Sequence, residues 1–434
     1  MADTSFSADL SRGIVYGLTD YLLATESFRR EGDGTILLYH NGVFRAIAEH
    51  RIGIRVNEIL RENNATAAIE KGSRIRTEVI ENIRLAAGLL PDLPSTTHIN
   101  FANGMLNITT GELEPHDPKF SSTLRIPVSF DKTGKRKAPH WERFIETTFP
   151  SQSQDIAWEI PAYLLIPEIS IRQAPILIGA GWNGKTIYCD MITRLIGEDN
   201  VANVSMQRLA DDQFAAAELV GKLVNIYDDL PSRSITDTGV FKAVTGGGRV
   251  SVRRLYRPGF QVRLFSRMLF SANQFPRSLD TSDGYFSRIA IIEFTKTFTP
   301  ATATPRHILL PQLTDPHELS GVINYCIPAL RNLLTKNSYT MGPEVLEASL
   351  MFRAATNPIA VWLGERTELA ADGVIPCGIF LIEYQKFCRE RGLPLGTMEA
   401  FSREVHQVFP TVKTLRPGSG AERTRVFAGL RWRV

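Results

Sequence analysis

The sequence has few cysteines, and none of them stands in a metal-binding pattern. The four cysteines show no CxxC spacing, and none of the eight histidines lies near a cysteine in a ligand-like arrangement. We therefore expect reduced thiols and no structural zinc. The cysteines are Cys189, Cys326, Cys377 and Cys388.

Long hydrophobic runs and a secretion signal are also missing. No run of 18 or more apolar residues occurs, and the first stretch, MADTSFSADLSRG, is polar. We expect a cytoplasmic protein without a membrane partner. The chain has no internal repeat and no low-complexity segment. Its 434 residues, 43% hydrophobic and 22% charged, are typical of a globular protein with two to four domains.

The chain also lacks a strong excess of positive or negative charge. The formal net charge is +3, although 37 of the 49 basic residues are arginines. A balance this small does not by itself indicate a polyanionic partner.

The order of the patterns predicts an α/β protein with four parts. Residues 1–144 mix helical stretches with two hairpins at Asn-Gly turns, which indicates an N-terminal α+β domain. In residues 145–300, short β-rich runs alternate with helical ones, as in a mainly parallel sheet with crossover helices. Residues 301–360 are a helical connecting or lid segment. Residues 361–434 show two helical patterns and then two apolar runs, the outline of a winged helix.

The stretch GAGWNGKT directly follows an apolar run and precedes a helical pattern. Its glycines allow backbone N–H groups to turn toward phosphates, while Lys185 would meet the β and γ charges and Thr186 would bind Mg²⁺. This pattern predicts a phosphate-binding loop (P-loop) for ATP with Mg²⁺. The alternative is a glycine-rich turn with a solvated lysine. The predicted nucleotide-binding residues are Gly179, Ala180, Gly181, Trp182, Asn183, Gly184, Lys185 and Thr186.

A second apolar run, in LVNIYDDLP, ends at Asp228 and Asp229. Carboxylates at the end of a strand next to a P-loop hold Mg²⁺ and polarise a water molecule. We predict these two aspartates, with Thr186, as the metal-binding residues. A solvated turn before Pro231 is the alternative.

Two further residues complete the predicted catalytic set of Lys185, Asp228 and Asp229. Asn273 ends the apolar run in RMLFSANQFP, where its amide would orient water or sense the γ-phosphate. Arg288 stands just before another apolar run and is a candidate arginine finger, which stabilises the transition state from a neighbouring subunit. Its alternative is a surface arginine at the start of a strand.

These motifs, together with DTGVFKAVTGGGRVSVRRLYRP, closely resemble superfamily 3 helicases of the phage and plasmid primase-helicase class, which includes poxvirus-type enzymes. INFANGMLNITTGELEPHDP is similar to the end of the domain that precedes the ATPase in that class. The resemblance spans roughly residues 30 to 430. It implies an AAA+-like P-loop ATPase core that works as a ring, usually a hexamer, and moves on single-stranded DNA in the three-prime to five-prime direction.

The resemblance also implies a DNA-contacting hairpin between the aspartates and Asn273. Two β-runs joined at RPG would carry its positive charges into the pore of a ring. A solvated charged hairpin is the alternative. Three positions depart from the family: Gly248 replaces an acid, Ser287 replaces an arginine beside Arg288, and Trp182 replaces a small residue. The predicted DNA-binding residues are Lys242, Arg249, Arg253, Arg254 and Arg257.

The sequence thus predicts an ATP-dependent replicative DNA helicase of a phage, plasmid or integrated mobile element, acting on single-stranded and forked DNA. A DNA-dependent ATPase that melts an origin, loads factors or serves defence fits the same motifs. A small-molecule kinase fits less well, because the sensor, finger and basic hairpin follow in order. Fewer than 150 residues precede the P-loop domain, and no paired acids at strand ends appear among them, so we expect no primer synthesis by this chain. A separate primase or polymerase is a candidate partner. The C-terminal block would bind DNA or protein.

Overall fold

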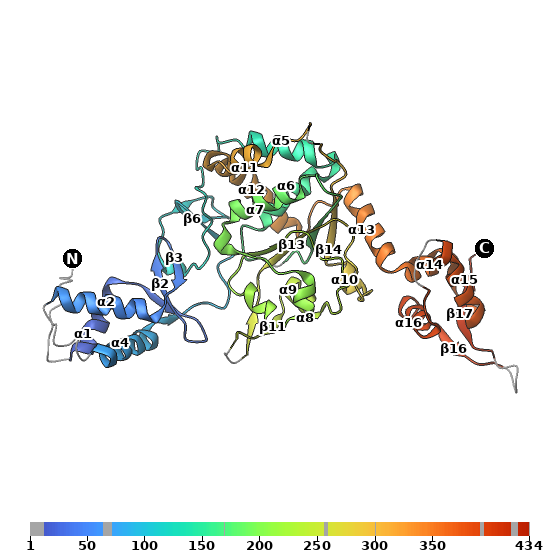
Figure 1. The fold of residues 1–434 in the computed structure, drawn as a ribbon, viewed down its shortest axis with the longest axis horizontal. Coiled ribbons are helices and arrows are strands. Elements are labelled where there is room, and N and C mark those ends of the chain that lie inside the picture. The colour runs from blue at the N-terminus through green and yellow to red at the C-terminus, as the bar shows by residue number, and fades with distance from the viewer. Residues whose placement is uncertain are drawn as a thin grey trace.

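The computed structural model describes residues 13–63, 72–168, 170–255, 259–299, 301–390, 395–417 and 424–433. Three regions follow one another from left to right in Figure 1: an N-terminal region, a central region built on a sheet, and a C-terminal region. The α/β class predicted from the sequence is confirmed.

The N-terminal region packs three helices against a small sheet. Helix α2 places Ile52, Val56 and Ile59 on one buried face, as the helical period requires. The sheet has the order β3-β2-β1-β4, and the predicted Asn-Gly hairpin joins its first two members. Its elements are α1 (Ile14–Thr25), α2 (Glu49–Glu62), α4 (Gly72–Ala86), β1 (Phe28–Arg30), β2 (Ile36–His40), β3 (Val43–Ala46) and β4 (Gly88–Leu89).

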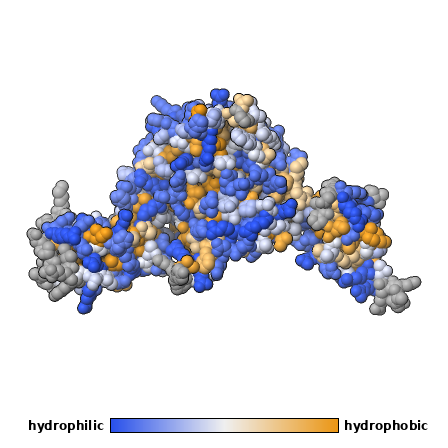
Figure 2. All heavy atoms as spheres, in the orientation of Figure 1, coloured by the Kyte–Doolittle hydropathy of each residue, from blue (hydrophilic) through white to orange (hydrophobic). Residues whose placement is uncertain are grey.

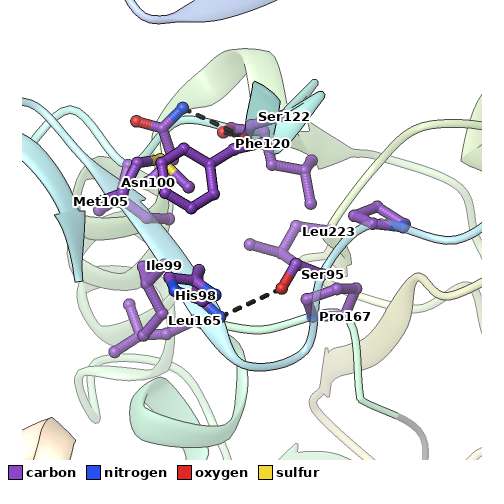
Figure 3. A pocket seen from close by; sticks show the side chains of 13 residues that line it. Ser95, His98, Ile99, Asn100, Met105, Phe120, Ser122, Leu165, Pro167 and Leu223 are labelled. Carbon is purple, nitrogen blue, oxygen red and sulfur yellow. Dashed lines mark hydrogen bonds between the residues drawn. The ribbon is translucent and has the colours of Figure 1, made fainter. Parts of the chain in front are cut away.

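A second small sheet connects this region to the central one. The strands β5 (His98–Phe101), β6 (Gly104–Asn107) and β7 (Leu113–Glu114) are antiparallel, and the other predicted Asn-Gly hairpin joins β5 to β6. A Cβ on Gly104 would lie 2.5 Å from the Glu114 carbonyl oxygen, so only glycine fits there. The cavity beside this sheet (Figure 3) has a volume of about 20 Å³, room for one water molecule and not for a substrate.

The central sheet has five parallel strands in the order β14-β8-β13-β10-β9. The three middle strands are buried nearly throughout, which explains why they appear in the sequence as continuous apolar runs. This sheet confirms the predicted alternation of strands and crossover helices. Its strands are β8 (Ala174–Ile178), β9 (Val201–Ala202), β10 (Val224–Tyr227), β13 (Arg267–Ala272) and β14 (Ile289–Glu293).

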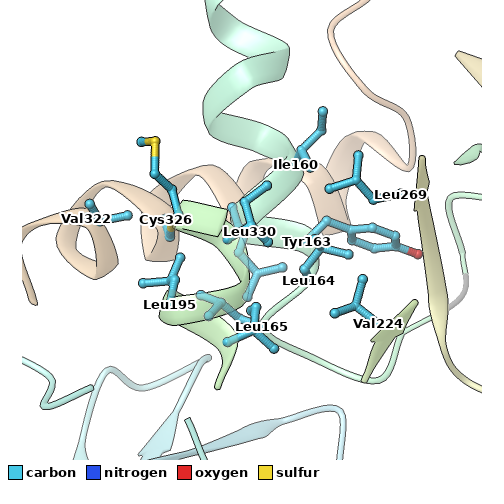
Figure 4. Close-up of a cluster of buried hydrophobic side chains, with 14 of the residues drawn as sticks. Ile160, Tyr163, Leu164, Leu165, Leu195, Val224, Leu269, Val322, Cys326 and Leu330 are labelled. Carbon is cyan, nitrogen blue, oxygen red and sulfur yellow. The ribbon is translucent and has the colours of Figure 1, made fainter. Parts of the chain in front are cut away.

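Helices cover both faces of the central sheet. One face packs into the large cluster of Figure 4, where Tyr163, Leu195 and Leu330 meet side chains of the strands. Its helices are α5 (Pro139–Thr148), α6 (Gln154–Tyr163), α7 (Lys185–Ile196), α11 (Arg306–Leu313) and α12 (Pro316–Lys336). The helices of the other face are α8 (Met206–Asp211), α9 (Gly239–Thr245), α10 (Asp283–Phe286) and α13 (Pro343–Thr356). Short 3₁₀ turns are η1 (Pro118–Phe120), η2 (Ser151–Ser153), η3 (Glu198–Asn200) and η4 (Ala215–Leu219).

The large cluster extends across two predicted domain boundaries. Ile99 from β5, Trp141 from α5 and Val322 from α12 belong to the same set of buried side chains. Glu318 accepts a hydrogen bond from the backbone N–H of Trp141 over 2.8 Å, which ties α12 to the start of α5. Residues before 144 and after 301 thus share the core of the central region, and the domain boundaries themselves stay predictions.

The C-terminal region has its own core around Trp362, Phe380 and Phe401. Three helices pack with an antiparallel sheet of order β15-β17-β16. The predicted order of two helices and a hairpin is present as α15, α16 and the pair β16–β17. The strand β15, which precedes them and pairs with β17, was not predicted. The elements are α14 (Pro358–Arg366), β15 (Thr367–Pro376), α15 (Cys377–Glu390), α16 (Met398–Val408), β16 (Lys413–Leu415) and β17 (Val426–Trp432).

The surface shown in Figure 2 is mostly hydrophilic, with separate apolar patches. Among the residues that the structure describes, no helix is both long and apolar enough to cross a membrane. The four cysteines are unpaired thiols, and all of them are buried.

Candidate functional site

Three of the predicted motifs meet at the carboxyl edge of the central sheet. The predicted P-loop, residues 179–186 and called the P-loop below, follows β8, the aspartate pair follows β10, and Asn273 follows β13. Because neighbouring parallel strands end at one edge of a sheet, side chains that follow them come together there. A cleft of about 1070 Å³ lies at this edge, and α5 and α11 contribute to its walls. Its volume suits a nucleotide-sized ligand.

The P-loop leads directly into α7, which begins at Lys185. Gly184, the residue before the helix, has φ +92°, a conformation that favours glycine. A Cβ on Gly179 would lie 2.6 Å from the Phe294 carbonyl oxygen, so this position also requires glycine. These two glycines are therefore explained by the backbone, and the N-terminus of α7, with its positive dipole end, faces the cleft.

Lys185 lies inside the P-loop and is almost fully buried. Its Nζ donates to the carbonyl oxygens of Gly179 at 2.5 Å and Ala180 at 3.2 Å. It also reaches the side-chain oxygens of Asn183 at 3.1 Å and Asn273 at 3.4 Å. These are all neutral acceptors, so an anionic phosphate in the cleft would be a stronger partner for the ammonium group.

Burial lowers the pKa of Lys185, and the negative charges of Asp228 and Asp229 oppose that shift. The lysine and both carboxylates line the same cleft. The ammonium group is thus partly desolvated and has two carboxylates nearby, so that charge on a ligand would act on it more strongly than in bulk water.

Ser271 organises the aspartate pair. Its hydroxyl donates to Asp228 Oδ1 and accepts a hydrogen bond from the backbone N–H of Asp229 at 3.0 Å. Asp229 has φ +58°, unusual for a residue other than glycine or asparagine, and its Oδ1 accepts from Asn273 Nδ2 at 2.9 Å. The carboxylates are therefore held in place by the next strand of the sheet.

The residues present fit a Mg²⁺ ion bound together with a nucleotide. Within the described residues, no three His, Cys, Asp or Glu side chains form a metal-binding group on their own. Mg²⁺, however, commonly takes one or two carboxylates and completes its shell with phosphate oxygens and water. Asp228, Asp229 and the exposed Thr186 line the cleft and offer such a partial set.

Trp182 is the most unusual residue of the P-loop. It has φ +62°, and its side chain is 70% exposed at the cleft. Its carbonyl oxygen accepts a hydrogen bond from the backbone N–H of Phe298 at 2.7 Å, which joins the P-loop to the segment that precedes α11. A bulky residue in this conformation costs on the order of 1–2 kcal/mol relative to one with negative φ.

Several residues that line the cleft were not predicted from the sequence. Ser271 stands two positions before Asn273, so the alternation of side chains along β13 places both on one side and was a usable signal. His140 and Arg143 come from α5, and Arg306 begins α11, where it pairs with Asp190 at 2.6 Å. No local motif marks these three, because they reach the cleft only through helix packing.

Arg288 lies at the opposite edge of the sheet from the cleft. In the register of β14 and β8, Ile289 pairs with Ala174, whereas Gly179 follows the other end of β8. Ala174 and Gly179 are five residues apart along β8, which corresponds to about 16 Å along the sheet. Arg288 donates to the Gly284 carbonyl oxygen, and among the described residues no carboxylate pairs with it and its Nε has no hydrogen-bond partner.

The predicted DNA-contacting hairpin is present as β11 (Arg249–Val252) and β12 (Phe260–Arg263). Arg249 and Arg253 are exposed, and Arg263, which the sequence analysis did not select, lies directly opposite Arg249. Like charges directly opposite on a sheet are unfavourable without an anion between them. The basic face therefore suits a ligand that carries phosphates.

Lys242, another predicted DNA-binding residue, stands apart from this face, on helix α9. Lys242 forms an ion pair with Asp280 at 2.8 Å. Burial alone would raise the pKa of Asp280, but hydrogen bonds from Lys242, Ser282 and Thr238 outweigh it and bring the pKa well below its usual range. The charge of Lys242 is thus already compensated. Arg257 lies outside the described residues.

Comparisons with known proteins match two parts of the chain. Residues 22–150 match the family described as "D5 N terminal like". Residues 177–288 match a family of unknown function (DUF5906), and this stretch contains the P-loop, the aspartate pair, Asn273 and Arg288. The D5-type match points to a phage-type primase-helicase-like protein. It agrees with the order of the motifs in the sequence.

The solved structures that resemble the chain include three of the NrS-1 C-terminal region. They share 12–13% identity, cover 95% of this chain and 98% of theirs, and give TM-scores of 0.49, 0.48 and 0.50. At this identity the likeness concerns the fold alone. It extends over nearly the whole length of both chains.

Proposed function

We propose that this protein is an ATP-dependent replicative DNA helicase of a phage, plasmid or integrated mobile element. The observation that carries the proposal is the meeting of Lys185, Asp229 and Asn273 in one cleft, with Arg288 at the far edge of the same sheet. Because Arg288 lies far from the cleft of its own chain, it could act as an arginine finger only in the cleft of a neighbouring copy, as in a ring of identical subunits.

In the proposed site, the α7 N-terminus and Lys185 bind the phosphates of ATP. Mg²⁺ held by Thr186, Asp228 and Asp229 would draw charge from the β- and γ-phosphates. Asp229 polarises the attacking water, and Asn273 fixes the carboxylate of Asp229 through the 2.9 Å hydrogen bond and lies close enough to respond to the γ-phosphate. Lys185 exchanges its neutral acceptors for phosphate oxygens when ATP binds.

We infer that Arg288 serves the cleft of a neighbouring subunit. The distance of about 16 Å along the sheet is too long for its side chain to reach the P-loop of its own chain. A head-to-tail interface that brings one subunit's Arg288 to the next subunit's cleft would close into a ring, for which we propose six subunits. In this proposal the core is AAA+-like.

The β11–β12 hairpin would hold single-stranded DNA in the pore of the ring, with translocation in the three-prime to five-prime direction. Arg249, Arg253 and Arg263 on the exposed face supply contacts to phosphates. The C-terminal region is a candidate winged helix for DNA or protein.

A second function fits the same site: a DNA-dependent ATPase that melts an origin, loads other factors or serves defence without processive unwinding. A strand-displacement assay on a forked duplex with ATP and Mg²⁺ separates the two. The helicase proposal requires displacement that depends on ATP hydrolysis. Hydrolysis stimulated by single-stranded DNA without displacement would favour the second function instead.

A further inference from the structure

A second cleft lies between the N-terminal region and the β11–β12 hairpin. Its volume is about 610 Å³. In Figure 1, β11 is at the lower edge of the central region and the N-terminal region lies to its left. The cleft is lined by Asp33, Gly34, Thr35, Glu49, Arg84, Gly259 and Phe260.

An arginine of the hairpin meets a carboxylate of the N-terminal region at this cleft. Arg254 Nη1 lies 3.2 Å from Asp33 Oδ2, and the two side chains are only 32% and 24% exposed. The other oxygen of Asp33 accepts from the backbone N–H of Thr35 at 3.0 Å, so the carboxylate is held in a turn. A partly buried pair of this kind is screened less by salt than one on the open surface.

The same arginine lies near an aromatic ring. The guanidinium carbon of Arg254 is 5.6 Å from the centre of the Phe260 ring, and Phe260 is partly exposed and lines the cleft. An aromatic ring beside a cation is the combination on which bases stack while phosphates are bound, as in proteins that hold single strands.

A second ion pair between the two regions offers a comparison. Arg249 Nη2 lies 3.7 Å from Asp92 Oδ2, and these side chains are 65% and 83% exposed. Exposed pairs at such distances contribute little. The contact of Asp33 is thus the closer and more buried of the two.

We propose that this cleft is a binding site for single-stranded DNA, in which a phosphate replaces the carboxylate of Asp33 on Arg254 and a base stacks on Phe260. The carboxylate and the phosphate are both anionic oxygen acceptors for the same guanidinium group. Asp33 therefore competes with DNA, and binding at the cleft separates the Asp33 turn from the hairpin. This inference rests on the proposed DNA-binding function.

The test measures binding of a fluorescent oligothymidine to the full chain at fixed ionic strength. Asp33→Asn keeps the turn to Thr35, because an amide oxygen accepts the same hydrogen bond, but it removes the competing charge. We expect the affinity to rise by about threefold to tenfold, and Asp92→Asn, the matched control, to change it by less than about twofold. In an Arg254→Ala background, Asp33→Asn should have no effect.

Phe260 is tested with a pair of variants that separate stacking from packing. Phe260→Leu keeps apolar volume on the hairpin and should weaken binding by about fivefold or more, whereas Phe260→Trp should bind at least as well as the wild type. Circular dichroism of each variant checks that the fold is retained.

Two results would overturn the proposed site on Arg254 and Phe260. Unchanged or weaker binding by Asp33→Asn would overturn the competition, and unchanged binding by Phe260→Leu would overturn the stacking site. A wild-type protein that does not bind single-stranded DNA at all would instead refute the proposed function itself.

Discussion

The side chain of Asn273 donates a hydrogen bond to Asp229 Oδ1 over 2.9 Å and so joins the ends of β13 and β10. The amide oxygen of Asn273 also lies 3.4 Å from Lys185 Nζ. One neutral residue thus contacts both the lysine that would bind phosphate and the carboxylate that would polarise water. A change at the phosphates can therefore be transmitted to the sheet through Asn273.

The first prediction concerns Lys185. Lys185→Ala should abolish ATP hydrolysis, because no other cation of the P-loop would meet the β- and γ-phosphates. The fold should survive, since the Nζ contacts only polar oxygens of the loop and Asn273. A steady-state ATPase assay checks this, with the exposed Lys386→Ala as the control of unchanged activity. Normal turnover by Lys185→Ala would show that residues 179–186 do not form the ATP-binding site.

The second prediction separates the two aspartates. Asp229→Asn should bind ATP but lose turnover by about 10²-fold or more, because an amide does not polarise water as a carboxylate does. Asparagine also tolerates the positive φ of this position, so the turn should persist. Nucleotide binding by calorimetry and single-turnover hydrolysis measure the two effects. Loss of binding together with turnover would assign Asp229 to nucleotide affinity.

The sequence predicted the central sheet and the site at its carboxyl edge because the signals there are local. The run from Leu223 to Ile226 and the run that ends at Asn273 are buried strands, and buried parallel strands are apolar throughout. Gly179 and Gly184 of the P-loop are required by the backbone itself. Local constraints of this kind are visible in a single sequence.

Other features depend on contacts between distant residues and left no local signal. Arg143 reaches the cleft only because α5 packs beside the P-loop. The residues near Lys137 lie against α12, where a Cβ on Gly321 would be 2.1 Å from the Lys137 carbonyl oxygen. Strand β15 has one face largely exposed and no strong alternation, so its pairing with β17 was missed.

The third prediction tests this contact of α12. Gly321→Ala should lower the free energy of unfolding by about 1–3 kcal/mol, because the added methyl group collides with backbone that has to move. Gly364→Ala is the matched control: Gly364 is also helical, but nothing lies within 4 Å of its Cβ position. That variant should be more stable by about 0.5–1 kcal/mol. Urea unfolding of both proteins makes the comparison, and equal stabilities would contradict the packing.

The fourth prediction concerns the hairpin. Replacing Arg253 and Arg263 with alanine should weaken binding of single-stranded DNA and reduce the slope of log affinity against log salt by about 0.7 for each lost phosphate contact. ATP hydrolysis without DNA should remain. Arg74→Ala, an exposed arginine of the N-terminal region, is the control for net charge. An unchanged slope would mean that the hairpin is only a solvated surface.

In the proposed ring the ATPase site is shared between subunits, with Lys185 from one chain and Arg288 from the next. Arg288→Ala alone should bind ATP but hydrolyse it more slowly, by up to about 10³-fold. Lys185→Ala alone should be inactive because it fails at the phosphates. The decisive measurement is ATP hydrolysis after the two inactive variants are mixed under conditions that exchange subunits, with native mass spectrometry to confirm mixed oligomers. Hydrolysis should recover, since some interfaces then pair an intact Lys185 with an intact Arg288, whereas verified mixed oligomers without any recovery would contradict a shared site.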